Sequence, residues 1–214
     1  NAYQAVVAEN PASGSQPKVR LQQCIIDNAY DAGILAVSSS LEADNTLVSN
    51  CGSNISLVLG GDYRFTHCTV AAYPGFFQHK NPVLSAGNAV LINGSPVSAP
   101  LQAAFTNCIF WGEGGLVDNE VQVSRQGTDP FDVRFVNCLI KNNTDPPAAV
   151  FTDCLRNSHP LFDSVNVARR YFDFHTSNPA APGLDKGVAT ALPADLDGNP
   201  RSNGLPDLGC YEKQ

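Results

Sequence analysis

The hexapeptide FTNCIF occupies residues 105–110, and nearly the same phrase returns as FVNCLI at 135–140. In a β-strand the side chains alternate between two faces, so Phe105 and Cys108, three positions apart, would point in opposite directions. Both residues are apolar, and a single residue between them must therefore reverse the alternation. Asn107 is the candidate, because Asn is among the residues that most readily adopt a left-handed backbone with positive φ.

The phrase recurs along most of the chain. Aligned on cysteine, its copies are LQQCII (21–26), LVSNCG (47–52), FTHCTV (65–70), FTNCIF (105–110), FVNCLI (135–140) and FTDCLR (151–156). Successive cysteines lie 27, 17, 40, 30 and 16 residues apart. Such spacings are typical of a β-solenoid whose coils carry loops of variable length.

Stacked coils would align the cysteines into an internal ladder, since free cysteine behaves as a small buried hydrophobe. The odd number of cysteines, seven, and the lack of any C-x-x-C motif argue against a disulfide framework or a zinc site. The predicted inward cysteines are Cys24, Cys51, Cys68, Cys108, Cys138 and Cys154. The predicted bend residues are Gln23, Asn50, His67, Asn107, Asn137 and Asp153.

A further strand precedes the cysteine phrases, as in ILAVSS (34–39), ISLVLGG (55–61), AVLING (89–94) and VQVSR (121–125). Continuous apolar runs are typical of parallel sheets. The runs ILAV (34–37), SLVL (56–59) and AVLI (89–92) are apolar on both faces, so we expect the tail or a partner chain to cover their outer surface. The pattern predicts an all-β, right-handed parallel β-helix with three sheets and about five coils.

We expect the coils over residues 1–157, followed at 158–214 by an irregular, proline-rich tail that packs on the solenoid within the same domain. Tyr171, Phe172 and Phe174 are the expected apolar anchors of this tail. A solenoid needs such a cover because open strand edges invite aggregation.

The F-x-N-C-x-I phrases resemble those of right-handed parallel β-helix proteins of the pectate-lyase-like superfamily. The tail resembles the C-terminal segment named choice-of-anchor Q, through SNPA at 177–180, DKG at 185–187, DLDGNPR at 195–201 and DLGCYE at 207–212. The resemblance implies a bacterial protein that is secreted, periplasmic or exposed on the cell surface, with its export signal removed. It implies no particular reaction. We also expect further domains of a longer chain, because residue 1 already lies close to a strand.

Composition argues against two kinds of partner. With 13 Lys and Arg against 20 Asp and Glu, the net charge is −7, and nucleic acid is therefore not expected as a partner. No apolar stretch approaches the roughly 20 residues that a membrane-spanning helix needs, so membrane insertion is not expected.

The excursion YPGFFQHKNP at 73–82 combines aromatic and polar side chains, which suit the faces and hydroxyls of sugar rings. We expect it to bind polysaccharide together with Trp111; the alternative is that its aromatic rings hold the loop onto the solenoid. The candidate ligand-binding residues are Tyr73, Phe76, Phe77, His79, Lys80 and Trp111.

A polysaccharide lyase needs a base beside the uronate carboxylate and acidic residues that hold calcium. The basic residues fall singly on different coils, and Arg125 with Glu120, which flank VQVS, are the best remaining catalytic candidates. Three functions stay open: a non-catalytic polysaccharide-binding protein, a lyase or glycoside hydrolase with part of its groove on these coils, and a structural surface module.

The pentapeptide DLDGN at 195–199 places the oxygens of Asp195, Asp197 and Asn199 at alternate positions around a glycine turn, as calcium loops do. A twelve-residue loop closed by glutamate is missing, so an Asx turn is the alternative. Apart from this candidate calcium site, no cofactor is expected.

Overall fold

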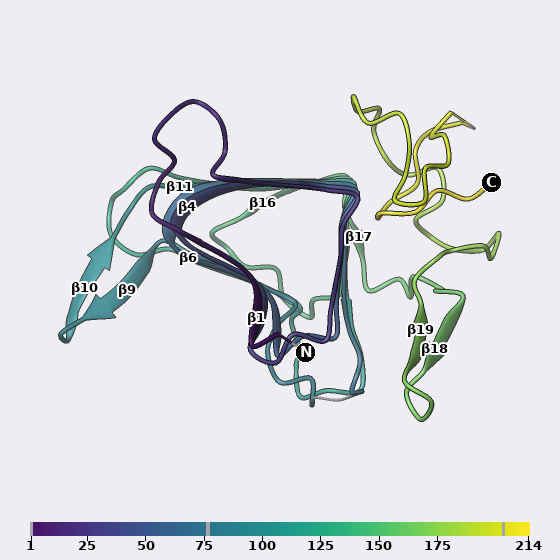
Figure 1. Ribbon diagram of the computed structural model, residues 1–214, viewed down its shortest axis with the longest axis horizontal. Helices are drawn as coiled ribbons and strands as arrows, with labels where there is room; N and C mark the ends of the chain where they lie inside the picture. Colours follow the sequence, from purple (N-terminus) through teal and green to yellow (C-terminus); the bar gives the residue numbers. More distant parts are fainter. Residues whose placement is uncertain (1, 76–77, 203) are drawn as a thin grey trace.

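The computed structural model of the chain describes residues 2–75, 78–202 and 204–214. Over these residues the chain forms strands and loops without a helix, and so contains no helix that is long and apolar enough to cross a membrane. Most strands pair in parallel, and successive passes of the chain stack on one another (Figure 1). The predicted all-β fold with parallel, solenoid-like sheets is confirmed.

The largest sheet has nine strands and is sharply bent. Its strands are β1 (Gln4–Glu9), β2 (Val19–Gln22), β4 (Ala32–Asp44), β6 (Ser53–Thr66), β8 (Leu84–Gly87), β11 (Leu101–Thr106), β13 (Val121–Ser124), β14 (Phe131–Val136) and β16 (Val150–Thr152). The long strands β4 and β6 run through the bend, where Ser38 and Leu59 have positive φ of 45° and 57°. Two of the three expected sheets are thus continuous in these two strands. The first half of the sheet contains β1, β8 and β13, and the second half contains β2, β11, β14 and β16.

A second sheet has six short strands. They are β3 (Ile25–Asp27), β5 (Leu47–Ser49), β7 (Thr69–Ala72), β12 (Ile109–Gly112), β15 (Leu139–Ile140) and β17 (Leu155–Arg156). Two antiparallel hairpins complete the fold, β9 (Ala89–Ile92) with β10 (Ser95–Ser98), and β18 (Ser164–Asn166) with β19 (Tyr171–Asp173).

One residue of positive φ carries each pass of the chain from the nine-stranded into the six-stranded sheet. These residues, which we call the bend ladder, are Gln23 (50°), Asn45 (45°), His67 (52°), Asn107 (55°), Asn137 (48°) and Asp153 (50°). The left-handed residue reverses the side-chain alternation, so Phe105 and Cys108 are both 0% exposed. The polar phrase in the middle of an apolar run is therefore a corner.

Asn50 and Cys51 lie outside the bend ladder, contrary to the alignment on cysteine. Pairing of Leu47 with Ile25 on one side and Thr69 on the other places Asn45 at the corner. Asn50 also has positive φ, 53°, but follows the far end of β5, at a different corner.

Thr46 consequently occupies the cysteine position in this pass. Its Oγ1 donates to the carbonyl of Asp44 at 3.0 Å, two residues earlier in the chain. The thiol of Cys108 makes the same type of contact with the carbonyl of Thr106 at 3.2 Å. A small side chain that bonds to its own strand is what this position requires, and threonine meets that requirement as cysteine does.

The core contains a ladder of stacked rings beside the cysteines. Neighbouring rings of Phe65, Phe105, Phe135 and Phe151 have centroids 5.2, 4.6 and 4.8 Å apart and lie within 18° of parallel. All seven cysteines are free thiols. The interior is therefore held by packing and not by crosslinks.

The tail, residues 158–214, packs on the outer face of the six-stranded sheet. Apolar residues of both parts form one cluster: Leu47, Ala71, Ile109, Trp111 and Leu139 from the strands, with Phe162, Phe174, Leu208, Cys210 and Tyr211 from the tail. The expectation that the tail covers the strands at 34–39, 55–61 and 89–94 is not met. Consecutive apolar residues, such as Ile109–Phe110 and Leu139–Ile140, make the six-stranded sheet apolar on both faces, and the tail packs there instead. Of the expected anchors, Tyr171 is 59% exposed, whereas Phe174 is buried.

Side-chain amides of the bend ladder point outward and hold the tail. They donate to tail carbonyls at 2.8 Å in four pairs: Asn137 to Lys186, Asn107 to Val188, Asn45 to Ala194 and Gln23 to Asp195. The tail therefore runs along the ladder from its later passes toward its earlier ones.

Candidate functional site

The structure buries Tyr73 and Trp111, the two predicted sugar-binding aromatic residues that lie within the described ranges. Tyr73 and Trp111 are only 4% and 3% exposed. Tyr73 stacks on Phe172 of the tail with ring centroids 5.9 Å apart, and Trp111 meets the ring of His159 edge-on at 5.6 Å. Both contacts are with the tail, whereas the alternative to sugar binding was that the rings hold the 73–82 loop onto the solenoid.

The remaining residues of that prediction divide into three cases. Lys80 is exposed, and His79 is 6% exposed. Phe76 and Phe77 lie outside the described residues. Within the described ranges, Lys80 is exposed whereas Tyr73, His79 and Trp111 are buried, so these four side chains do not form one open surface.

His79 and Glu120, expected in two different sites, meet in a buried hydrogen-bonded pair. His79 Nε2 lies 2.8 and 3.0 Å from the two carboxylate oxygens, and the side chains are 4% and 1% exposed. Gly112 must be a glycine here, because a Cβ would lie 2.3 Å from Glu120 Oε1. The pair ties the 73–82 excursion to the strand that follows Glu120.

Arg125 does not join Glu120. The two residues lie at opposite ends of β13, and the guanidinium of Arg125 sits over the ring of Phe131, 5.5 Å from its centroid. The structure therefore separates the two residues that were the catalytic candidates from the sequence.

The DLDGN segment forms an Asx turn. Asp195 is 0% exposed, and its Oδ1 accepts the backbone N–H groups of Asp197 at 2.9 Å and Asn199 at 2.7 Å. Asp197 turns away to bind His175 Nε2 at 2.8 Å. Across the described ranges, no group of three or more His, Cys, Asp or Glu side chains is arranged to hold a metal. A calcium ion at Asp195, Asp197 and Asn199 stays a prediction.

Charged residues that look scattered in the sequence form rows on the outer face of the second half of the nine-stranded sheet. Strand register aligns Arg20, Glu42, Arg64, Ala104 and Arg134 in one row. It aligns Ser40, Asp62, Gln102 and Asp132 in the next. We call this surface the polar face. Because paired strands lie about 4.8 Å apart, each row offers a side chain at that interval along the stack.

Ion pairs fix part of the polar face. Glu42 accepts from Arg20 at 2.8 Å and from Arg64 at 2.6 Å, and Arg134 donates to Asp132 at 2.6 Å. Hydrogen bonds between arginine and carboxylate are directional, so these side chains are held in defined positions.

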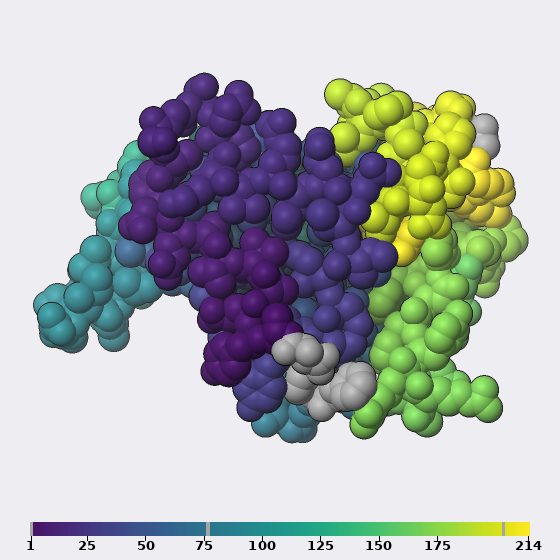
Figure 2. Space-filling model, viewed as in Figure 1, coloured from purple at the N-terminus to yellow at the C-terminus, as the bar shows by residue number. Residues whose placement is uncertain are grey.

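A groove of about 660 Å³ lies over the polar face. Its lining includes the loop at 11–17, the outward residues of β4, β6 and β11, and Pro130. The 11–17 loop rises on one side of this face and the tail rises on the other (Figures 1 and 2).

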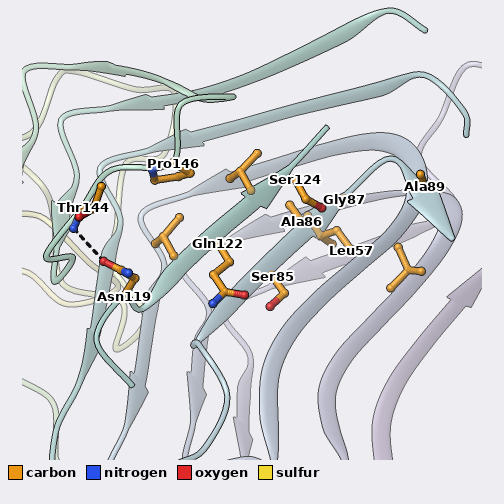
Figure 3. Close-up of a pocket in the computed structure, with 13 residues that line it drawn as sticks. Leu57, Ser85, Ala86, Gly87, Ala89, Asn119, Gln122, Ser124, Thr144 and Pro146 are labelled. Carbon is orange, nitrogen blue, oxygen red and sulfur yellow. Dashed lines mark hydrogen bonds between the residues drawn. The ribbon is translucent and has the colours of Figure 1, made fainter. Parts of the chain in front are cut away.

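A smaller hollow of about 460 Å³ lies beside β13. Asn119, Thr144 and Pro146 lie at one end of it and Ala89 at the other, with Gln122 between (Figure 3). The Thr144 N–H donates to Asn119 Oδ1 at 2.8 Å and fixes the first end. The lining contains no charged residue.

Comparison of the chain with family models, with curated proteins and with solved structures finds no significant match. The geometry above is therefore the basis for any statement about function.

Proposed function

We propose that this chain is a right-handed parallel β-helix of about five coils, from a secreted or surface-exposed bacterial protein, and that it binds an extended polysaccharide along its polar face. The polymer would lie in the groove parallel to the stacking direction. Successive sugar units would then meet equivalent side chains on successive strands.

The repetition of polar groups in register carries the proposal. Guanidinium, carboxylate and amide groups supply the donors and acceptors that sugar hydroxyls need. Ion pairs already hold Arg64, Glu42 and Arg134, so these side chains lose little conformational freedom when a ligand binds. The side chains of Asp62 and Gln102 make no hydrogen bond within the described ranges, and both are exposed in the lining of the groove.

A glycan array with the purified chain tests the proposal. We expect binding to at least one extended polysaccharide, and at least tenfold weaker binding by the double variant Arg64→Ala, Gln102→Ala, since each lost hydrogen bond to a charged or amide group costs about 1 kcal/mol or more. Arg169→Ala is the matched control, because it removes the same charge from an exposed position on the tail. Unchanged affinity in the double variant would move the ligand off the polar face. An array without any bound glycan would favour a structural surface module.

A glycoside hydrolase is a second candidate, favoured by two carboxylates in the groove. Asp62 and Asp132 flank Gln102 in register, on strands two spacings apart, about 10 Å between backbone positions. Carboxyl groups roughly 6.5–9.5 Å apart leave room for the water of an inverting mechanism. Release of new reducing ends from the bound glycan, lost in Asp62→Asn while binding persists, would identify hydrolysis. Unsaturated product absorbance would identify a lyase instead.

A further inference from the structure

The β9–β10 hairpin, residues 89–98, projects from the body of the molecule (Figures 1 and 2), and we call it the arm. Leu91, Ile92 and Val97 are 72%, 49% and 39% exposed. The turn at Asn93 and Gly94 has φ of 51° and 78°, the two positive values of a tight type I′ turn. The arm is thus a well-defined structure that presents apolar side chains to its surroundings.

The exposed side chains of the arm have no role in the core. Residues 81–112 contain no Lys, Arg, Asp or Glu, although the whole chain has 33 such residues, 13 basic and 20 acidic. Strand pairing sets Leu91 opposite Pro96 and Val90 opposite Val97, so both faces of the hairpin are apolar. A two-stranded hairpin alone is marginally stable in water, and large exposed apolar groups on it indicate a contact surface.

We expect a contact through a face of the arm and not through the outer edge of β10. Ile92 and Ser95 flank the two-residue turn, and the next pair along the hairpin is Leu91 and Pro96. In a hairpin of this type, the N–H and C=O groups of that second pair point away from the partner strand. Proline has no N–H to donate, so a further strand cannot pair regularly on the outer edge of β10.

An uncharged receptor for such a face lies at the base of the same arm. The hollow beside β13, the arm groove, is lined by no charged side chain, and Ala89 belongs both to its rim and to the start of β9 (Figure 3). Gln122 and Ser124 of its lining are exposed. The tail packs on the other sheet, so it leaves this surface open.

We propose that two copies of this chain associate about a twofold axis, with the arm of each copy lying in the arm groove of the other. Because the arm starts at the rim of the groove, one axis beside Ala89 brings both arms onto both grooves. Such a contact is self-complementary and closes at two copies. Because the net charge of −7 makes copies of this chain repel one another, an association is most favourable through surfaces that carry no charge. The arm and the arm groove are two such surfaces.

Sedimentation velocity over a range of concentrations tests the association. We expect the wild-type chain to dimerise, and Leu91→Asp on the arm and Gln122→Arg in the groove each to weaken the dimer at least tenfold. Val165→Asp is the matched control, since Val165 is 37% exposed on the other hairpin. Unchanged thermal unfolding of each variant shows that the fold is intact.

A crosslinking experiment tests the arrangement. A chain carrying Leu91→Cys is mixed with a differently tagged chain carrying Gln122→Cys. Mild oxidation should form a disulfide between the two kinds of chain. A chain carrying Val165→Cys in place of Leu91→Cys should form no such disulfide. The wild-type mixture corrects for the partly exposed native thiols Cys24 and Cys154. A chain that stays monomeric at every concentration, or a dimer that ignores both substitutions, overturns the proposal. Leu91-dependent binding to lipid vesicles without dimerisation also overturns it and assigns the arm to a membrane surface.

Discussion

Asn107 and Val188, 81 residues apart, exchange two hydrogen bonds: the Asn107 amide donates to the Val188 carbonyl at 2.8 Å and accepts the Val188 N–H at 2.9 Å. The same amide nitrogen lies 2.9 Å from His67 Nε2. Burial and the charge of Arg201 lower the pKa of His67 to about 3, so its neutral ring accepts this bond. Asn107 thus turns the chain, binds its ladder neighbour and fixes the tail.

Asn107→Gly keeps a residue suited to positive φ and removes the amide. We expect its free energy of unfolding to fall by about 2 kcal/mol, because partly buried backbone groups of Val188 lose their partners. The free energy of unfolding of Asn107→Ala should be lower still, since alanine is strained in the left-handed conformation. Urea denaturation measures both, with Asn143→Ala at an exposed position as the control. Wild-type stability of Asn107→Gly would show that the tail does not depend on this contact.

Phe105 occupies the middle of the ring ladder, stacked between Phe65 and Phe135 and 0% exposed. Phe105→Ala should cost about 3–5 kcal/mol in urea denaturation, through lost burial and the cavity that remains. Phe151 ends the ladder and is only partly buried, so Phe151→Ala should cost clearly less. Equal costs at both positions would mean that the stack does not act as a continuous core.

Thiol reactivity should differ between the end and the middle of the cysteine ladder. Cys24 is partly exposed and should react first with Ellman's reagent in the native protein. Cys154 is also partly exposed, but a hydrogen bond with Cys138 and burial raise its pKa, which slows it. Burial raises the pKa of Cys51 to about 11 and that of Cys210 to about 12, so both thiols should react only after the protein is unfolded in urea. Seven thiols should react in denaturant, and a reductant should leave the melting temperature unchanged.

His175 makes stability depend on pH. Its two ring nitrogens lie 2.5 Å from Asp173 Oδ1 and 2.8 Å from Asp197 Oδ2, and its ring stacks on Tyr211 at 3.7 Å. Partial burial opposes the charged ring, but hydrogen bonds and charges of Asp197 and Asp173 raise the pKa of His175 above 6.5. In the same way, partial burial opposes the charged form of Asp173, but His175 brings the pKa of Asp173 below 3.8.

The sign of this dependence follows from the two shifts. The His175 contribution is complete below pH 6.5 and is lost as pH rises through its raised pKa, whereas the Asp173 contribution is present above pH 3.8 and is lost in stronger acid. His175→Asn should therefore lower the free energy of unfolding by about 0.5 kcal/mol near pH 5.5, a value reduced by solvent screening, and have little effect near pH 9. An equal loss at both pH values would mean that the ring contributes by packing alone.

Arg201 and Glu212 form a buried ion pair that joins the two ends of the tail motif. Their atoms lie 2.8 Å apart, the side chains are 1% and 2% exposed, and Arg201 also donates to Asn45 of the bend ladder at 3.0 Å. Arg201→Ala should destabilise the fold by about 3–5 kcal/mol, because Glu212 is left buried without its partner. Arg169→Ala on the exposed tail surface should change stability by less than about 0.5 kcal/mol in the same denaturation assay. A mild loss in Arg201→Ala would mean that water reaches Glu212.

The alternation argument at FTNCIF was enough to predict an all-β fold with parallel sheets and a corner at Asn107, because side-chain parity is a local property. Register is not local. In the second pass two asparagines lie five residues apart, and the cysteine follows the wrong one, so Asn45 was missed in favour of Asn50.

The polar face could have been predicted from a short repeated phrase in the sequence. The phrase D-x-R-F occurs as DYRF at 62–65 and DVRF at 132–135, each just before a bend residue. Read with the same parity, it places Asp and Arg on the outer face beside an inward Phe. The face that the tail covers also had a signal, since Ile109 and Phe110 are consecutive apolar residues and one of them must point outward. Burial of His79 with Glu120 depends on a 41-residue separation and had no local sign.

The order of contacts between the tail and the corners makes the packing of the tail sensitive to errors in strand register. Lys186, Val188, Ala194 and Asp195 accept from the corner residues Asn137, Asn107, Asn45 and Gln23, in that order, so the tail passes from later corners to earlier ones. A slipped or omitted pass would put at least one amide out of reach of its carbonyl. The final 57 residues, 158–214, therefore pack completely only on strands that are stacked in the correct register.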